Sequence, residues 1–567
     1  MLSAAALVQN QALLRSDEAL LAALDQAEAW SGGLTTLLGR WCLQLPLGNL
    51  SFRLALPCVL GAGLLGLACF ELAYALFRAQ GGYSRLDPWL GWGASLVGAL
   101  NLPALSEGAV AGGATLGPAL GLLGCAQLVQ RKARHDLFAT LRYAMMWGAL
   151  LCESVFAALL VLLAAAFLWP ERAGPERASE ASATSASWWR WPAAASVALS
   201  AAASIALCNG WFADGWAVGQ SLSKSFVPGR PFAWLEAVGW LWCLGAAFAT
   251  VFALTDRRPM YVMGLFALAD WFIPAANDLG WVSAASRGAG RTDVHLLALG
   301  YLAAGGALGL RTFGETAQAL GLLGARQLSA LLSVVAIAGG LAAGEDAVMT
   351  LNQTEALAAE AWASEALYEL PARTLVITHS ASRGRRLRAA QLQGARPDVL
   401  VVPLSELTQA RNVAGWMKRE PALQLLLIDL SLGSVPSERA LATLVDSRPV
   451  YIEPTPEWDP RLLEHLEPGV PLSRLWPHAL ARSDRLRAWE RTGKATERLF
   501  RAAQSGVRSD AAMLDLLRDD FRQLAATLAR VDSVAQKRVT ESALLFPQPS
   551  VVVDEIAVAT AGLATGQ

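Results

Sequence analysis

Long apolar runs dominate the first 343 residues of the chain. A helix needs about 20 mostly apolar residues to cross a bilayer, because it rises 1.5 Å per residue through a hydrocarbon core about 30 Å thick. Runs that suit membrane helices lie at 54–77, 89–106, 112–130, 191–210, 232–254, 259–276, 294–310 and 320–343. A further apolar stretch, 137–168, is interrupted at Cys152 and Glu153 and is too long for one straight helix. We interpret it as a broken or re-entrant pair, since irregular backbone at membrane depth must be shielded by protein or face water.

From Leu370 onward the pattern becomes that of a water-soluble domain. Short β-branched runs predict strands at 373–380, 398–405, 423–431 and 448–454, and polar helix-like segments separate them. Strands that alternate with helices predict a small α/β unit with a largely parallel sheet. Residues 479–504 and 508–541 have the spacing of amphipathic helices. A last strand is predicted at 550–559, followed by a frayed tail.

These patterns predict two parts of different class. The first is an α-helical polytopic membrane domain, residues 1–343, with about nine to eleven membrane segments. A linker helix at 344–369 leads to a soluble α/β domain at 370–475, to amphipathic helices at 476–545 and to a strand and tail at 546–567. Whether residues 1–24 span the membrane stays open, because they lack the basic start of a signal peptide and polar residues interrupt them.

Composition agrees with a membrane protein and excludes some functions. The chain is 54% hydrophobic and 16% charged, whereas soluble domains are about 45–50% apolar and 25% charged. The net charge of −1 and the absence of a basic stripe with interleaved aromatics argue against nucleic-acid binding. All seven cysteines precede residue 244 and none forms a CxxC pair, so we interpret them as small apolar residues in helices.

Basic residues predict which side of the membrane each loop occupies. Lys and Arg prefer the cytoplasm, and the densest short basic loop holds Arg131, Lys132 and Arg134. Alternation from this loop sends the soluble domain outside, provided that 137–168 turns back. We therefore predict an inner (plasma) membrane protein whose C-terminal domain is periplasmic or extracellular.

The same topology gathers acidic residues on the outer face. Charged residues at membrane depth are costly and usually functional. Glu107 lies at a helix hairpin and Glu153 at the break, so these two are the most informative. The other acids on this face, which include Asp17, Glu18 and Asp293, also suit ordinary solvated loops.

The soluble domain carries no nucleotide motif. No GxGxxG follows its first strand and no GxxxxGK[ST] occurs anywhere in the chain. His379 ends the first strand, where open α/β sheets often bind ligands, although a polar residue at a strand end is the simpler interpretation. We find no Ser-His-Asp or Cys-His arrangement.

Four stretches, taken in order, resemble one family. They are LPLGN and Arg53 near residues 45–53, the hairpin with Glu107 at 101–123, the span that opens with Asp293, and the segment 370–407 with RPDV at 396–399. The chain resembles a bacterial multi-pass family of unknown function, related to the eukaryotic transmembrane protein O-mannosyltransferase within the GT-C glycosyltransferase superfamily. This resemblance implies transfer of a sugar from a polyprenyl-phosphate donor.

The chain departs from this family where catalysis is expected. The first outer loop of the family carries an acidic stretch and then His-Pro-Pro-Gly. Here Asp17 and Glu18 stand for the acids, but Trp30-Ser31-Gly32-Gly33 replaces His-Pro-Pro-Gly. The family's Glu-x-Tyr is also incomplete, since Ala109 takes the tyrosine position after Glu107.

The expected reaction assigns roles to candidate residues. A carboxylate near the outer surface can act as general base on an acceptor hydroxyl, which makes Asp17, Glu18 and Glu107 the catalytic candidates. A cation must hold the lipid phosphate, and substrate binding is predicted for Arg53, Glu153, Lys224, Arg230 and Asp293. For each basic residue, interfacial snorkelling is the simpler role. No cofactor is certain, and a divalent metal at Glu107 is left open.

Three functions remain at this point. The first is a GT-C-like glycosyltransferase with a membrane lipid, a polyprenyl-phosphate sugar and a protein or glycan acceptor as partners. The second is a catalytically degenerate member that serves as a structural or binding subunit of an envelope membrane complex. The third, a transporter, lacks the expected paired and broken spans in two halves of the chain.

Overall fold

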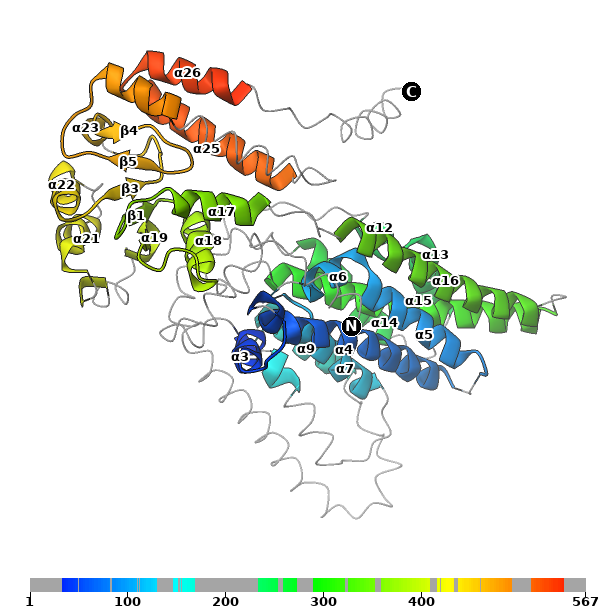
Figure 1. Cartoon of the computed structure of the whole chain (residues 1–567). Coiled ribbons are helices and arrows are strands. Elements are labelled where there is room, and N and C mark those ends of the chain that lie inside the picture. Colours follow the sequence, from blue (N-terminus) through cyan, green and yellow to red (C-terminus); the bar gives the residue numbers. More distant parts are fainter. Residues whose placement is uncertain are drawn as a thin grey trace, which may run out of the picture. The chain divides into compact units, whose positions relative to one another are not determined.

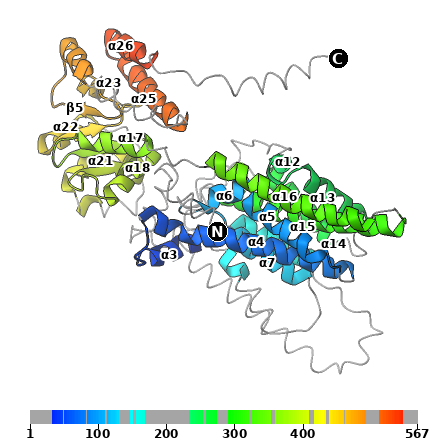
Figure 2. The ribbon, with the colours of Figure 1, turned by 45° about the vertical axis from the view of Figure 1, so that its right-hand side comes forward.

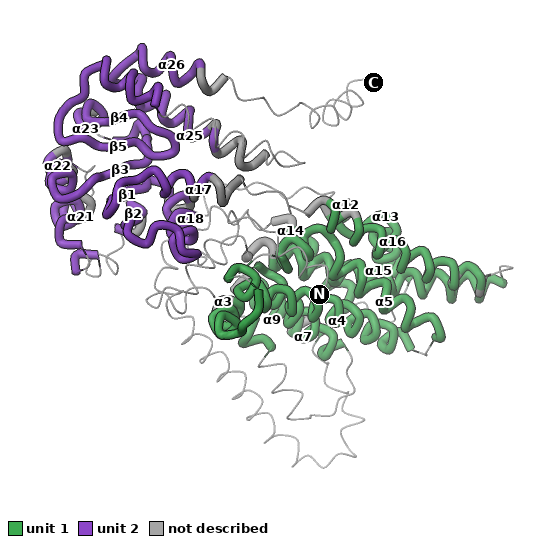
Figure 3. Tube along the Cα trace, viewed as in Figure 1, with its two compact units in different colours: residues 1–11, 18–352 green, residues 12–17, 353–567 purple. Residues whose placement is uncertain are grey.

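The structure is a computed structural model of the whole chain. It describes residues 33–48, 50–81, 84–109, 111, 113–129, 146–150, 153, 155–168, 233–252, 258–272, 289–321, 325–351, 358–407, 416–418, 420–432, 437–458, 460–491 and 511–544. Two compact units emerge, and among the described residues the first ends at Leu351 and the second starts at Ala358 (Figures 1 and 3). The linker helix expected at 344–369 corresponds to parts of two helices. Helix α16 (Ala325–Leu351) continues eight residues past the boundary expected at 343, and α17 covers Ala358–Tyr368.

The first unit is a bundle of apolar helices. Within the described residues, three helical stretches are long and apolar enough to cross a bilayer: Leu50–Gln80, Asp293–Ala319 and Ala330–Met349. Leu116–Val129 and Trp240–Phe252 are shorter apolar helices. Their length and composition mark the chain as an integral membrane protein.

Helices α4 (Leu50–Gln80) and α15 (Ala289–Ala319) form the centre of this bundle. Helix α4 packs against α7 (Leu116–Val129), α5 (Asp87–Leu100) and α3 (Gly33–Cys42), and α15 packs against α13 (Trp240–Phe252), α5, α4 and α14 (Arg258–Phe272) (Figure 2). Helix α9 (Val155–Leu168) packs against α7 and α14, and α16 packs against α5. Small residues permit close approach: a Cβ atom on Gly245 would lie 2.7 Å from the carbonyl oxygen of Gly306.

Two predicted spans are interrupted by capping and by glycine. The run 89–106 is wrong as a single helix, because Asn101 ends α5 and its side chain accepts a hydrogen bond from the Ala104 amide to start α6 (Leu102–Gly108). The run 232–254 divides into α12 (Ala233–Val238) and α13 at Gly239, whose φ of 87° suits glycine. In the 137–168 stretch the structure describes 146–150, Glu153 and α9, and the rest lies outside the described residues, as does the run 191–210.

The second unit contains the α/β domain. Its five-stranded sheet has the order β2-β1-β3-β5-β4, in which β1 (Leu375–Thr378), β2 (Leu400–Pro403) and β3 (Val450–Ile452) are parallel. The hairpin β4 (Leu466–Glu467) and β5 (Ser473–Leu475) joins antiparallel beside β3. Strands β1, β2 and β3 match the predicted runs 373–380, 398–405 and 448–454.

Helices cover both faces of this sheet. On one face Leu375, Ile377 and Val450 pack with Leu426 of α21 (Gln424–Ser431) and Leu444 of α22 (Glu438–Ser447). Helix α18 (Ala381–Leu392) packs against β1 and β2, and α17 (Ala358–Tyr368) packs on α18. Short helical turns α19 (Leu404–Leu407), η5 (Pro421–Leu423) and α23 (Pro460–Leu463) complete the connections.

Two predictions for the second unit are wrong in detail. The run 423–431 is helical and not a strand, because a short continuous apolar run fits a buried helix as well as a buried strand. The predicted helix 508–541 is two helices, α25 (Ala511–Ala529) and α26 (Ser533–Leu544). Asp532 separates them, since its carboxylate accepts the amides of Val534 and Ala535 and thereby caps α26. Residues 482–491 are helical within the predicted 479–504 helix, and the strand predicted at 550–559 lies outside the described residues.

Candidate functional site

Glu107 closes the turn between α6 and α7. Its Oε2 accepts a hydrogen bond from the amide of Ala114 at 3.1 Å, and the side chain is half-buried. On the same turn, the Thr115 hydroxyl donates to the Cys58 carbonyl at 2.7 Å, and the Cys58 thiol lies 3.5 Å from the carbonyl oxygen of Gly113. The hairpin is therefore fixed to the N-terminal part of α4.

Glu153 is buried and held from α3. Its Oε1 accepts hydrogen bonds from both the backbone amide and the hydroxyl of Thr35, the second at 2.7 Å. A buried acid requires such partners, because a carboxylate without them costs several kcal/mol to remove from water. Thr35 therefore sets the direction of the Glu153 carboxylate.

The side chains of Asp293 and Glu153 both lie beside Gly117. Asp293 lies near the start of α15 and is 1% exposed. The position that a Cβ atom would occupy on Gly117 is 3.2 Å from Oδ1 of Asp293 and 3.2 Å from the Cβ of Glu153. Glycine at the start of α7 thus leaves room for side chains from two distant parts of the sequence.

The three acids lie against the turn before α7 and its first residues. Glu107 bonds to this segment at Ala114, and Glu153 and Asp293 flank it at Gly117. We call this set the acidic site. It draws its carboxylates from α6, from the stretch before α9, and from α15.

Arg53 has a structural role close to this site. Its guanidinium donates to the carbonyl oxygens of Leu47 at 2.8 Å, Gly48 at 3.2 Å and Leu43 at 3.3 Å. These bonds hold the turn that precedes α4, in which Gly48 has a φ of 53°. The LPLGN…Arg pattern is therefore explained by the turn itself.

Four candidates cannot be placed. Asp17, Glu18, Lys224 and Arg230 lie outside the described residues.

In the described part of the chain, no three His, Cys, Asp or Glu side chains come together as a metal site.

A second polar group near the start of α15 was missed by the sequence analysis. Asp270 of α14 accepts a hydrogen bond at Oδ2 from the Trp234 indole at 2.6 Å, and the same oxygen lies 2.8 Å from Nδ1 of His295. An available signal was Asp270 itself, because an acid inside a predicted span is rarely without a function.

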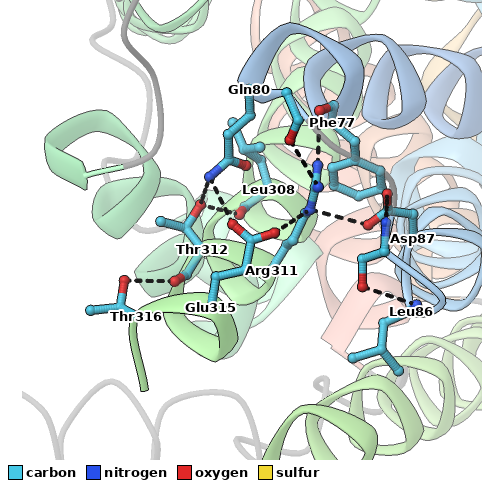
Figure 4. Close-up of polar contacts among 11 residues, drawn as sticks. Phe77, Gln80, Leu86, Asp87, Leu308, Arg311, Thr312, Glu315 and Thr316 are labelled. Atoms are coloured by element: carbon cyan, nitrogen blue, oxygen red, sulfur yellow. Dashed lines mark hydrogen bonds and ion pairs between the residues drawn. The ribbon is translucent and has the colours of Figure 1, made fainter. Parts of the chain in front are cut away.

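A buried ion pair occupies the other end of α15. Arg311 lies 3.1 Å from Asp87 and 2.9 Å from Glu315 and donates to the Phe77 carbonyl at 2.8 Å (Figure 4). Gln80 donates to Glu315 and to the Thr312 hydroxyl. Eighteen residues separate Asp293 from Arg311, or about 27 Å along a helix, which is close to the thickness of the hydrocarbon core. The two polar groups therefore lie near opposite ends of one membrane helix.

In the second unit, the Glu453 side chain occupies the carboxyl end of β1, where α/β sheets often bind ligands. The helix that follows β1 begins at Ser380, and the Ser380 amide donates to Glu453 at 2.8 Å. Arg383 donates to the same carboxylate at 2.6 Å. Glu453 thus occupies the position of an anionic ligand at the N-terminus of α18. The predicted strand-end residue His379 pairs instead with Glu457 at 2.7 Å, on the surface.

The chain has similar proteins among solved structures. No family model matches the chain, and no curated protein matches it. Among solved structures, the chain is similar to ArnT from Cupriavidus metallidurans bound to undecaprenyl phosphate, with a TM-score of 0.44, 13% identity, and coverage of 80% of this chain and 92% of that chain. ArnT in the apo state gives a TM-score of 0.40 and 13% identity over 74% of this chain and 82% of that chain.

Proposed function

We propose that this chain is a GT-C-like membrane glycosyltransferase. It moves a sugar from a polyprenyl-phosphate donor to a hydroxyl of a protein or glycan on the non-cytoplasmic side. The observation that carries the proposal is the acidic site, where Glu107, Glu153 and Asp293 gather along one hairpin at one end of the bundle. The resemblance of the surrounding motifs to the GT-C superfamily supports it.

The acidic site suits a sugar. Carboxylates accept hydrogen bonds from sugar hydroxyls, and charge placed near a reacting centre stabilises the cationic character that a sugar ring gains as its bond to phosphate breaks. Burying Glu153 and Asp293 is costly unless their charge is used. We assign Glu153 and Asp293 to binding and orienting the donor sugar, with Glu107 holding the hairpin that carries them.

A lipid-linked donor fits the position of the site. Asp293 of the acidic site opens a helix that is long and apolar enough to cross a bilayer, so a donor dissolved in the bilayer reaches the site directly. A nucleotide sugar would need a phosphate-binding loop, and the N-terminus of α18 is filled by Glu453. The polyprenyl phosphate is held by cations; Lys224 and Arg230 are the proposed ones, because the Arg53 guanidinium already binds three carbonyl oxygens.

The alternative is a catalytically degenerate binding subunit of an envelope complex. It is favoured by Trp30 to Gly33, which stand where the similar family carries His-Pro-Pro-Gly. In that case the acidic site would bind a lipid-linked sugar without transferring it.

One experiment tests both. The full chain in lipid nanodiscs is given a panel of undecaprenyl-phosphate-linked sugars together with an envelope extract that supplies protein and glycan hydroxyls as acceptors. The release of undecaprenyl phosphate and the binding of each donor are both measured. The wild type should release it, and Asp293→Asn and Glu153→Gln should slow release by about 10²-fold or more. Glu345→Gln, an exposed acid on α16, is the matched control and should behave as wild type.

Two results would contradict the proposal. If the wild type binds a donor but releases no undecaprenyl phosphate, the degenerate alternative is correct. If wild type and both acidic-site variants release it equally, the chain is a transferase whose site lies elsewhere.

A further inference from the structure

The Asp270–His295 pair lies beside the acidic site but is not part of it. Asp293 and His295 are two residues apart on α15, so they differ by about 3 Å along the helix axis and point to nearly opposite sides of it. Asp293 faces Gly117 of α7, and His295 faces Asp270 of α14. The start of α15 therefore separates two polar groups at the same depth.

The hydrogen bonds of Asp270 define the tautomer of the neutral His295 imidazole. Oδ2 of Asp270 accepts from the Trp234 indole, which can only donate, and from Nδ1 of His295. An ionised carboxylate only accepts, so Nδ1 carries the hydrogen of this pair, and the neutral imidazole then has its lone pair on Nε2. Among the described residues, the imidazole makes this one polar contact, and its side chain is 18% exposed.

The carboxylate of Asp270 is poised to stabilise a cation. The Asp270 side chain is 7% exposed, and within the described residues its Oδ1 is buried and has no hydrogen-bond partner. A buried acid that is only half satisfied is costly, and natural proteins keep such groups where they serve a function. A buried aspartate that orients a histidine through Nδ1 stabilises the imidazolium formed when Nε2 takes up a proton.

We propose that His295 accepts the proton of the acceptor hydroxyl during sugar transfer and that Asp270 positions it. This inference rests on the proposed function. The acceptor oxygen forms a bond to the anomeric carbon, the bond from that carbon to the phosphate oxygen breaks, and its electron pair leaves with the polyprenyl phosphate. The proton moves from the acceptor oxygen to Nε2 of His295 and is then released to water.

This role completes the division of the site between two substrates. The donor sugar lies on the Gly117 side of α15, against Glu153 and Asp293. The acceptor reaches the start of α15 from the aqueous side, where His295 is partly exposed. Glu107, one of the three candidate bases from the sequence, instead bonds to Ala114 within its own hairpin.

The first test uses a variant that keeps the hydrogen bond to Asp270. The amide of His295→Gln can still donate to Asp270 but cannot take up a proton. Transfer by His295→Gln should fall by about 10²–10⁴-fold while binding of undecaprenyl phosphate is unchanged. Added imidazole should restore part of the transfer lost in His295→Ala, which a purely structural role would not allow. His295→Gln that transfers sugar at the wild-type rate would overturn the proposal.

A second readout needs no turnover. Diethyl pyrocarbonate modifies an unprotonated imidazole, and peptide mass spectrometry measures the modification at each of the five histidines of the full chain. At about pH 9 imidazoles are unprotonated, so the rate reports the basicity of Nε2. His295 should react in the wild type and more slowly in Asp270→Asn, which lacks the carboxylate, whereas the exposed His478 should react equally in both. An Asp270→Asn variant with an unchanged rate at His295 would contradict the pairing. If the wild type transfers no sugar, the proposed function fails on its own, and this readout still decides whether His295 carries a reactive Nε2.

Discussion

At the scale of single residues, two arginines from the most specific motifs have structural roles. Arg53 binds carbonyl oxygens before α4, and Arg396 of RPDV donates to those of Leu370 at 2.8 Å and Pro371 at 3.1 Å. Arg396 also pairs with Asp398 at 2.8 Å, and this hydrogen bond holds the pKa of Asp398 well below its usual range. A guanidinium suits such positions because its donors form a rigid fork. Arg53 and Arg396 therefore stabilise turns of the backbone.

A buried carboxyl in the second unit makes stability depend on pH. Asp520 lies 2.8 Å from Arg383, which also contacts Glu453 and Asp519, and burial raises the pKa of Asp520 to about 7. The folded-state pKa is above the ordinary 3.8, so the folded domain favours the protonated form. The stabilising contribution is full below pH 3.8 and is lost as pH rises through about 7.

We predict that Asp520→Asn removes this dependence. Between pH 4 and 7 the free energy of unfolding of the wild-type domain should fall relative to the variant by at most ~1.4 kcal/mol per pH unit. Asparagine keeps an acceptor for the Trp362 indole, which bonds to Asp520 at 3.1 Å. Pulse proteolysis of the full chain in urea, following the fragment that contains α18, measures the difference. Parallel pH curves for the two proteins would contradict the raised pKa.

At the scale of elements, close packing of α4 on α7 positions the acidic hairpin. A Cβ atom on Gly61 would lie 2.8 Å from the Leu116 amide nitrogen, and Thr115 bonds to Cys58 in the same contact. Any side chain at Gly61 therefore pushes the start of α7 away from α4, and with it Gly117, beside which Glu153 and Asp293 both lie.

We predict that Gly61→Ala destabilises the bundle by about 1–3 kcal/mol, the usual cost of overpacking. The control is Gly264→Ala on α14, where nothing lies within 4 Å of the added atom. This control should be neutral or gain up to ~1 kcal/mol of helix propensity. Unfolding temperatures in one detergent compare the two variants. Equal stability would show that α4 and α7 tolerate a wider separation.

The ion pair of Arg311 and Asp87 ties α15 to α4 and α5 (Figure 4). Arg311→Met leaves the buried Asp87 carboxylate without its cation, so we expect a loss of about 3–5 kcal/mol in the free energy of unfolding. The double variant Arg311→Met, Asp87→Leu should recover part of this loss, because an apolar pair often replaces a buried ion pair at little cost. Unfolding temperatures of both variants test this, and a double variant less stable than the single one would contradict it.

At the scale of the whole molecule, the basic loops predict that the second unit lies on the non-cytoplasmic side of the membrane. The native cysteines all lie in the first unit, so a cysteine-free chain can carry one reporter at a time. Arg487→Cys, on the second unit, should react with a membrane-impermeant maleimide in intact cells. Arg85→Cys, in the turn before α5, should react only after the cells are permeabilised. The reverse labelling would place the second unit in the cytoplasm and move the acidic site to the opposite side.

Local patterns in the sequence determined the kind of element in most of the described chain. Apolar length predicted α4, α7, α14, α15 and α16, and β-branched runs predicted β1, β2 and β3, because each signal is contained in neighbouring residues. The helix in place of a strand at 424–431 shows the limit, since a short apolar run does not encode its own partner.

Only the tertiary structure decided which polar residues meet. Glu153 and Asp293 are 140 positions apart in the sequence, and both lie against Gly117 of α7, where the absence of a side chain leaves room for them. Likewise, Asp270 selects the orientation of His295 through a contact between helices. The energy of a buried carboxylate depends on the partners that surround it in space, which no local pattern encodes. The sequence therefore supplied the acids and the helices, and long-range packing made a site of them.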